Sequence, residues 1–359
     1  MSKPKLFIPG PVDISPATFE AMCAPMIGHR GADFEALYSS IQPGLQQIAG
    51  TQRRVFLSTS SAWGVMEGSI RNLVQKKVLN LCCGAFSDKW FDVSQRCGKE
   101  AEKIQVEWGQ AIDPESVRAK LAEGGFDTVT MVHNETSTGV MNPLAEIAEI
   151  VNEFEEVLLV VDSVSSFSAV PIPCDKLGID VLLAGVQKAM ALPPGLTVFV
   201  TSEAALARAE STPDRGYYFD FIEFAKNDAK DNTPSTPAIT LLQALKQKVD
   251  SIMEEGLENR YARHAQNNAL VHAWVAANGF EHFAPEGYRS KTLTAVANNR
   301  EIDVPAFVKA VRQKHNILIN GGYGKIKGET FRISNMGNET VETMGEVLAA
   351  LDDVLPEIA

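Results

Sequence analysis

The sequence predicts an α/β protein with a mainly parallel sheet flanked by helices. Apolar runs of strand length alternate with helical patterns along most of the chain, as is typical of such sheets. The run at 157–161 is apolar throughout and therefore fits a strand buried on both faces. With 359 residues and 45% hydrophobic content, the chain is long enough for a large domain and a smaller one.

The expected elements form two groups along the chain. Strands are expected at 55–58, 78–82, 128–132, 157–161, 180–184 and 197–200. A long helix at about 236–256 links the domains and is followed by a strand at 293–296, a helix at 304–314, a strand at 331–334 and a final helix with one apolar face. We therefore expect an N-terminal segment at 1–20, a large domain at 21–255 and a small α+β domain at 256–359.

Lys188 is the most informative residue in the chain. It follows the apolar run 180–184 within a stretch of small residues that includes Gly185 and Ala189, and these offer the ammonium group no partner charge. Burial in a cleft favours the neutral amine, which can attack an aldehyde and hold a Schiff base. A surface lysine just past a strand is the alternative.

Asp162 ends the preceding apolar run. A carboxylate at the carboxyl end of a parallel strand points into the crevice where open α/β sheets bind ligands, although it could also cap the next helix. Pyridoxal 5′-phosphate requires an anion that keeps its pyridine nitrogen protonated and an amine that carries its aldehyde. Asp162 and Lys188 would meet both needs.

Several motifs carry a resemblance to one enzyme family. The chain resembles the class V, fold type I aminotransferases, and within them the alanine–glyoxylate and serine–pyruvate branch. The motifs are Asp162-Ser163-Val164-Ser165-Ser166, Gly185-Val186-Gln187-Lys188-Ala189, Pro193-Pro194-Gly195, Pro9-Gly10-Pro11, Glu135-Thr136-Ser137-Thr138-Gly139-Val140, Gly321-Gly322 and Phe331-Arg332-Ile333. The resemblance implies a transaminase with pyridoxal 5′-phosphate in its large domain, and Lys188 and Asp162 as catalytic residues.

The phosphate group is expected at the loop that contains Ser60, Ser61 and Ala62. These small residues precede a helical pattern that begins near Val65, and the N–H groups of a helix start suit a phosphate. An ordinary Ser-capped helix is the alternative. The resemblance adds Gln187 as a phosphate ligand.

The resemblance also implies a homodimer with shared active sites. In such a dimer, Ser235 or Thr236 from a second subunit would reach the phosphate. For the cofactor ring, the resemblance places Phe86 on one face and Val164 on the other, with the Thr136 hydroxyl in contact. Phe86 could instead be one of 17 phenylalanines that pack the core.

Substrate binding is expected to need specific cations, because a net charge of −12 repels carboxylates. Arg332, within the strand 331–334, can hold an α-carboxylate through two parallel hydrogen bonds, although an arginine in a strand often faces solvent. His29 and Arg30 could supply a second anionic subsite. They could equally brace the N-terminal segment.

The leading hypothesis is transfer of an amino group from a small amino acid, alanine or serine, to a 2-oxo acid, glyoxylate or pyruvate, by a ping-pong mechanism. The nearest rival is the phosphoserine aminotransferase of serine biosynthesis, which His29 and Arg30 motivate. A cysteine desulfurase-like lyase is disfavoured because no cysteine follows Cys174. A nicotinamide dehydrogenase is disfavoured because the expected Gly-x-Gly-x-x-Gly turn after the first strand is not found in this sequence. A binding protein without catalytic activity is disfavoured because it would not need both Asp162 and Lys188.

Composition bears on partners and compartment. The negative charge argues against nucleic acid and anionic membrane surfaces. No apolar run approaches the length of a membrane span, and the first residues lack the apolar part of a signal peptide, so a cytoplasmic enzyme is expected. The five cysteines lack the spacing of metal ligands, so no metal site is expected.

Overall fold

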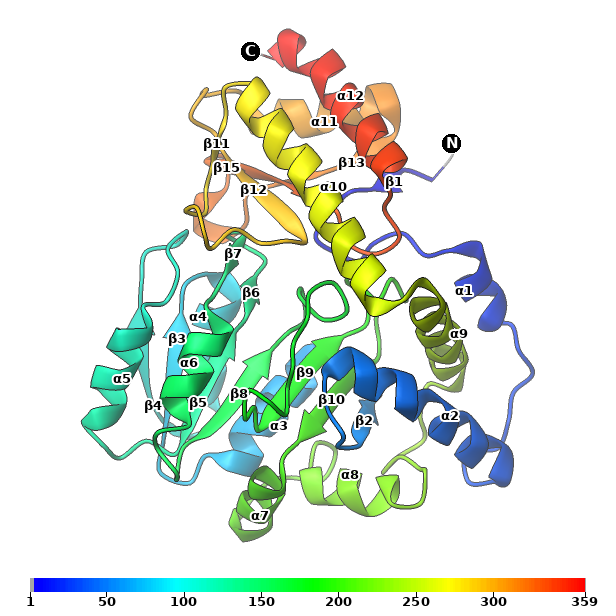
Figure 1. Cartoon of the computed structure of the whole chain (residues 1–359), viewed down its shortest axis with the longest axis vertical. Helices are drawn as coiled ribbons and strands as arrows, with labels where there is room; N and C mark the ends of the chain where they lie inside the picture. The colour runs from blue at the N-terminus through cyan, green and yellow to red at the C-terminus, as the bar shows by residue number, and fades with distance from the viewer. Residues whose placement is uncertain (1–2, 359) are drawn as a thin grey trace.

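The computed structural model describes residues 3–358, and its largest element is a seven-stranded sheet (Figure 1). The strand order is β2-β10-β9-β8-β5-β3-β4, and only β10 runs opposite to the other six. The strands are β2 (Val55–Ser58), β3 (Lys77–Cys82), β4 (Glu100–Gln105), β5 (Thr128–Val132), β8 (Leu158–Asp162), β9 (Val181–Gly185) and β10 (Thr197–Thr201). The predicted α/β fold with a mainly parallel sheet is confirmed.

Burial explains which strands could be predicted. Every residue of β5, β8, β9 and β10 is buried, so these strands are nearly continuous apolar runs. Strand β4 lies at the edge of the sheet, and four of its six residues are charged or polar. Charged side chains protect an edge strand from pairing with other chains, and they also hide it from a search for apolar runs. The sequence therefore did not predict β4.

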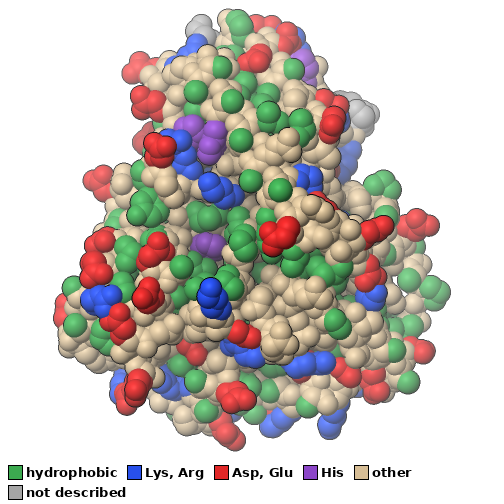
Figure 2. All heavy atoms as spheres, viewed as in Figure 1, with side chains coloured by type: hydrophobic (Ala, Val, Ile, Leu, Met, Phe, Trp, Pro, Cys, Tyr) green, Lys and Arg blue, Asp and Glu red, His purple; other side chains and the backbone are tan. Residues whose placement is uncertain are grey.

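Helices cover both faces of the large sheet (Figure 1). Residues of α2, α5, α6 and α9 share one buried apolar cluster with the sheet, and residues of α3, α4, α7 and α8 share another. The helices are α2 (Ala32–Ala49), α3 (Ala62–Leu73), α4 (Ala85–Arg96), α5 (Pro114–Ala122), α6 (Leu144–Val151), α7 (Glu203–Ser211), α8 (Phe221–Asp228) and α9 (Ile239–Glu255). Acidic and basic side chains are interspersed over the face shown in Figure 2.

A second apolar core lies at the top of Figure 1. Its antiparallel sheet has the order β11-β12-β15-β14 and packs against three helices. These elements are β11 (Glu281–His282), β12 (Leu293–Ala297), β14 (Asn320–Gly321), β15 (Thr330–Ser334), α10 (Leu257–Ala277), α11 (Val304–His315) and α12 (Val341–Ile358), with the 3-10 helix η1 (Gly324–Ile326) before β15. The strands and helices predicted for this part are confirmed.

The linking helix is shorter than predicted and is followed directly by a second helix. Helix α9 begins at Ile239, and Gly256, with a φ of 81°, separates it from α10. A positive φ is readily adopted by glycine, so the chain turns here without strain. The expected boundary between residues 255 and 256 falls at this junction, while the division into domains stays a prediction.

The first residues of the chain connect the two sheets. Strand β1 (Lys5–Leu6) pairs in parallel with β13 (Ile317–Leu318), next to the upper sheet, and the Ser334 N–H donates to Phe7 O at 3.0 Å. Further along, the Val12 N–H donates to Gln187 O at 3.3 Å, beside the turn after β9. Helix α1 (Pro16–Ala21) then packs against α9. No helix within residues 3–358 has the length and apolarity needed to cross a bilayer.

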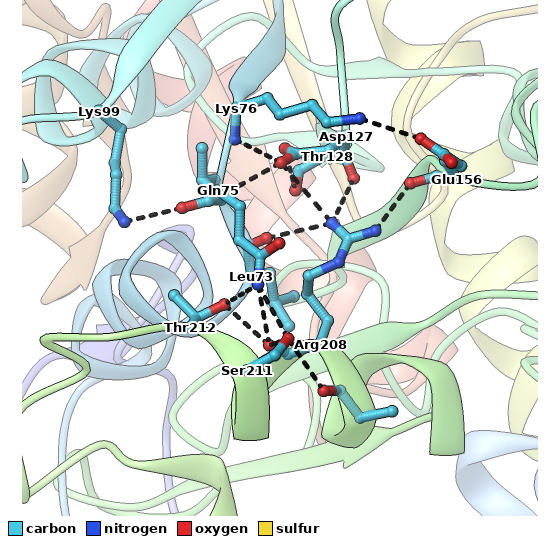
Figure 3. Close-up of polar contacts among 12 residues, drawn as sticks. Leu73, Gln75, Lys76, Lys99, Asp127, Thr128, Glu156, Arg208, Ser211 and Thr212 are labelled. Atoms are coloured by element: carbon cyan, nitrogen blue, oxygen red, sulfur yellow. Dashed lines mark hydrogen bonds and ion pairs between the residues drawn. The ribbon is translucent and has the colours of Figure 1, made fainter.

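A polar network closes the amino ends of the large sheet (Figure 3). The Asp127 carboxylate, just before β5, accepts the N–H groups of Gln75 and Lys76 at 2.9 and 2.6 Å, just before β3. Arg208 of α7 donates to Asp127 O at 3.3 Å and also forms an ion pair with the Asp127 carboxylate at 3.7 Å. These side chains connect the turns at the amino ends of the parallel strands, which is the end of the sheet opposite to their carboxyl ends.

Candidate active site

Asp162 and Lys188 line one small cavity at the carboxyl ends of the central strands. Asp162 is the last residue of β8, and Lys188 lies in the turn after β9. The cavity has a volume of about 120 Å³. Its lining consists of Ser61, Ala62, Trp63, Met66, Phe86, Val132, Asn134, Thr136, Asp162, Val164, Ser165, Gln187 and Lys188. Open α/β sheets bind ligands in this position.

The Lys188 amine lies among groups that disfavour its charge. Its Nζ donates to the Pro9 carbonyl oxygen, and no carboxylate in residues 3–358 forms an ion pair with it. The pKa of Lys188 is lowered to about 8, mainly by burial and in addition by the charge of Arg332, while the charge of Asp162 acts in the opposite direction. A Cβ at Gly10 would lie 2.5 Å from Lys188 Cδ, so this glycine makes room for the lysine. The amine is therefore available in its neutral, nucleophilic form near neutral pH.

Asp162 is a buried carboxylate without a cation in contact. Its Oδ1 accepts the Val164 N–H at 2.7 Å, and no ion pair to it occurs in the described chain. Burial raises the pKa of Asp162 to about 7, against the stabilising Val164 N–H. A positive group placed in the cavity would lower this pKa again, because it favours the ionised form. The site thus fits a ligand with a cationic ring nitrogen.

The start of α3 faces the same cavity. The helix begins at Ala62, three residues earlier than predicted, and its N-cap Ser61 makes no side-chain capping hydrogen bond. Ser60 lies just outside the lining and pairs with Ser58 through their hydroxyls at 3.0 Å. The Gln187 side chain lines the cavity as well. The structure therefore brings an uncapped helix start, which attracts anions, to the cavity.

The predicted ring-binding residues also line this cavity. Phe86, the second residue of α4, and Val164, after β8, both contribute to the lining. The Thr136 Oγ1 lies 2.5 Å from Ser165 Oγ. Sequence reasoning missed Tyr323, whose ring stacks on Phe86 with the centroids 5.6 Å apart and the planes at 23°. The glycines on both sides of Tyr323 were the available signal.

Arg332 lies behind this aromatic pair, on β15. The side chain is buried, Nε donates to Gly321 O and Nη1 donates to Thr136 O, each at 3.2 Å, and the Tyr323 ring centroid is 5.6 Å from Cζ. No carboxylate within the described residues pairs with it. Burial lowers the pKa of Arg332 to about 10, so the guanidinium stays charged at neutral pH. The Arg332 side chain does not line the Lys188 cavity, but it donates to Thr136, which does.

His29 and Arg30 lie apart from this cavity within one chain. The Arg30 guanidinium donates to Asn232 Oδ1 at 2.9 Å, to Thr233 O at 3.0 Å and to Pro234 O at 3.3 Å. His29 Nε2 is 3.5 Å from Thr236 Oγ1. Neither Ser235 nor Thr236 lines the Lys188 cavity of its own chain. These contacts brace the loop 232–236, and a role of these four residues in binding substrate or phosphate stays a prediction.

The fold and the site define an α/β enzyme with a reactive amine and a buried carboxylate for one small-molecule cofactor. Residues 78–334 match the model of the class-V aminotransferase family, and the chain belongs to this family. An uncharacterized aminotransferase of Methanocaldococcus jannaschii is 36% identical, over 98% of this chain and 94% of the relative. The serine–glyoxylate aminotransferase of Methylorubrum extorquens is 33% identical, over 93% and 86% of the two chains.

Solved structures agree with this family. The alanine–glyoxylate aminotransferase of Nostoc sp. superposes with a TM-score of 0.93 at 29% identity, covering 99% of this chain and 96% of that chain. The protein is therefore an aminotransferase of fold type I, and the resemblance stated from the sequence is confirmed. The family and its structural neighbours depend on pyridoxal 5′-phosphate.

Proposed function

We propose that this aminotransferase binds pyridoxal 5′-phosphate in the Lys188 cavity and transfers an amino group from alanine or serine to glyoxylate or pyruvate. One observation carries the proposal: Lys188 and Asp162 line the same small cavity at the carboxyl ends of β8 and β9, and neither has an ion-pair partner within residues 3–358. A cofactor with an aldehyde and a protonated ring nitrogen satisfies both side chains at once.

When bound, the cofactor supplies an electron sink for the negative charge that develops at the substrate α-carbon. Lys188 would hold the cofactor through Nζ, and the same atom, once free and neutral, would move the proton from the α-carbon. Asp162 would keep the ring nitrogen positive. Phe86 and Val164 would enclose the two ring faces.

Anion binding would be divided between two places. The uncapped start of α3 at Ser61 and Ala62, together with Gln187, would hold the phosphate. Arg332 would hold the α-carboxylate, since its guanidinium is buried and has no carboxylate partner in the described part of the chain. Both substrates of a ping-pong cycle carry this carboxylate, so one arginine would serve both half-reactions.

The choice of substrates is supported by the relatives. The Methylorubrum extorquens and Nostoc relatives are named for glyoxylate as acceptor. Phosphoserine aminotransferase activity is less supported, because three solved phosphoserine aminotransferases are 22%, 18% and 15% identical to this chain, and this likeness supports the fold alone. The hydrogen bonds of Arg30 within its own chain also leave fewer of its N–H groups for a substrate phosphate.

A homodimer is part of the proposal. Tyr217 and Tyr218 are 61% and 44% exposed, and large exposed aromatics are typical of contact surfaces. Tyr218 also donates to Thr59 O, beside the phosphate loop, at 3.1 Å. A second subunit on this surface would bring its Ser235 or Thr236 toward that loop. Light scattering after gel filtration tests the dimer, and the expected cytoplasmic location stays a prediction.

The proposed reaction is tested with single amino acids and 2-oxo acids. Purified protein saturated with pyridoxal 5′-phosphate is mixed with alanine, serine or phosphoserine and with glyoxylate or pyruvate, and the new amino acid is quantified by mass spectrometry. We expect glycine to form from glyoxylate with alanine or serine, and we expect no product with Lys188→Ala. Faster turnover of phosphoserine than of serine would refute the substrate assignment, and normal turnover by Lys188→Ala would refute the site.

A further inference from the structure

Glu135 is a fully buried carboxylate outside the lining of the Lys188 cavity. It ends the short strand β6 (Asn134–Glu135), which pairs with β7 (Val140–Met141). Its Oε1 lies 3.3 Å from the Phe86 nitrogen, 3.2 Å from the Ser137 nitrogen and 2.6 Å from the Ser137 hydroxyl. Its Oε2 lies 3.1 Å from the Ser87 nitrogen and 3.0 Å from the Ser87 hydroxyl. Hydrogen-bond donors, rather than a cation, therefore surround the carboxylate.

These contacts cap helix α4 from outside. The N-cap residue of α4 is Gly84, which has no side chain to accept the first N–H groups of the helix. The Ala85 N–H donates to Ser137 Oγ at 2.9 Å, and the next two N–H groups donate to the Glu135 carboxylate. A negative charge at a helix start is stabilising. A Cβ on Gly84 would lie 2.3 Å from Glu135 Cγ, so glycine permits this close approach.

The same turn also holds Arg332. The Thr136 carbonyl oxygen, one residue after Glu135, accepts Arg332 Nη1 at 3.2 Å. Phe86, whose own N–H contacts Glu135, faces the cavity and stacks on Tyr323. Glu135 thus lies between an aromatic side chain and a guanidinium that both belong to the site, without forming part of the cavity wall.

We propose that Glu135 is a positioning residue whose carboxylate holds the turn 135–137 against the start of α4, and thereby sets the Phe86 ring and the Arg332 guanidinium in one fixed relation. The inference rests on the proposed function, in which Phe86 covers the cofactor ring and Arg332 binds the substrate carboxylate. A shift of this turn would change the angle between cofactor and substrate. Reaction rates depend steeply on such alignment.

Glu135→Gln is the sharpest substitution, because it keeps the size of the side chain and removes only acceptor capacity. In either orientation, the amide NH₂ of glutamine faces a backbone N–H and a serine hydroxyl of the turn or the helix. The serine hydroxyl can turn to accept from this NH₂, but the backbone N–H is only a donor and loses its acceptor, so the turn must move. Ser137→Ala is a milder variant that removes one donor to Glu135 and the acceptor for the Ala85 N–H.

Asp127→Asn provides the matched control. Asp127 is also a buried carboxylate that accepts two backbone N–H groups (Figure 3). It lies just before the amino end of β5, whereas the cavity lies at the carboxyl ends of the parallel strands. We expect all three variants to lower the melting temperature of the cofactor-loaded enzyme. Only Glu135→Gln, and to a smaller extent Ser137→Ala, should reduce the visible circular dichroism of the bound cofactor. The same two variants should raise KM for both the amino acid and the oxo acid, by on the order of tenfold for Glu135→Gln.

Visible circular dichroism and KM values equal to those of Asp127→Asn would overturn the proposal. If Glu135→Gln does not fold, Ser137→Ala decides by the same two readouts. Failure of the proposed function is recognised separately, as a wild-type protein without coloured cofactor and without turnover. In that case the role of the turn is tested by hydrogen exchange at residues 85–87. If the turn holds the start of α4, exchange should be faster in Ser137→Ala than in Asp127→Asn, and equal exchange in the two variants would overturn the proposal.

Discussion

The reactivity of Lys188 should depend on pH with a midpoint near its pKa of about 8. An amine reacts with an aldehyde only in its neutral form, and the neutral fraction rises as the pH passes upward through the pKa. At pH 7, an amine with this pKa is neutral in roughly 9% of molecules, whereas a lysine with the ordinary pKa of 10.5 is neutral in roughly 0.03%. The lowered pKa should therefore raise the fraction of neutral Lys188 by about 300-fold at this pH.

The assay is covalent capture by the cofactor-free protein. Pyridoxal 5′-phosphate and cyanoborohydride are added between about pH 6 and about pH 10, a range that spans both pKa values. Modification of Lys188 is quantified by peptide mass spectrometry, with the exposed Lys309 as reference. Two variants supply the signs. Arg332→Gln removes a charge that lowers the pKa of Lys188, so the midpoint should rise, and Asp162→Asn removes the charge that raises it, so the midpoint should fall.

A midpoint near 10.5 in the wild-type protein would refute the reasoning, because it would place Lys188 in an aqueous environment. Shifts of both variants in the same direction would also refute it. They would show that changes of structure, rather than the two charges, dominate the pKa of this amine.

Three substitutions address the other parts of the site. Asp162→Asn should retain cofactor but slow turnover by about a hundredfold, because asparagine cannot stabilise the ring nitrogen by charge and a loss of about 3 kcal/mol has this effect. The measurements are kcat and the absorbance of the bound cofactor, and wild-type kinetics would show that Asp162 is only a helix cap. Arg332→Lys should raise KM in both half-reactions, while the melting temperature and the cofactor content stay close to those of the wild type. A rise in KM that is limited to one half-reaction would contradict a shared binding site for the carboxylate. Tyr323→Ala removes the ring stacked on Phe86 and should increase kcat/KM for leucine relative to alanine by about tenfold. An unchanged ratio would show that Tyr323 does not limit the size of the substrate side chain.

The sequence was most informative where burial is complete. Strands such as β8 and β9 are apolar at nearly every position, so they could be located to within a residue. The reversed direction of β10 could not be predicted, because an apolar run does not encode the direction of its strand. Strand β4 was missed because its edge position selects charged residues. Helix α3 was placed too late, since its first turn contains Ala62, Trp63 and Gly64 rather than a clear apolar period.

In the site, the residues that end strands could be predicted, and those that depend on remote contacts could not. Asp162 and Lys188 follow recognisable apolar runs, and the structure brings them to one cavity. Glu135 lies in a motif that the sequence displays, yet its role depends on N–H groups of α4 that are 48 and 49 positions earlier in the chain. Tyr323 likewise meets Phe86 only after the two sheets have come together.

Residues 5–12 contact both the upper part of the structure and the turn that carries Lys188. At one end, Phe7 O accepts the N–H of Ser334, on the strand that carries Arg332, and at the other end Pro9 O accepts Lys188 Nζ. One short segment of the chain therefore contacts both the strand that carries Arg332 and the Lys188 amine. For protein engineering, residues 5–12 are therefore a poor place for a truncation, because their backbone hydrogen-bonds both to the strand that carries Arg332 and to the Lys188 amine.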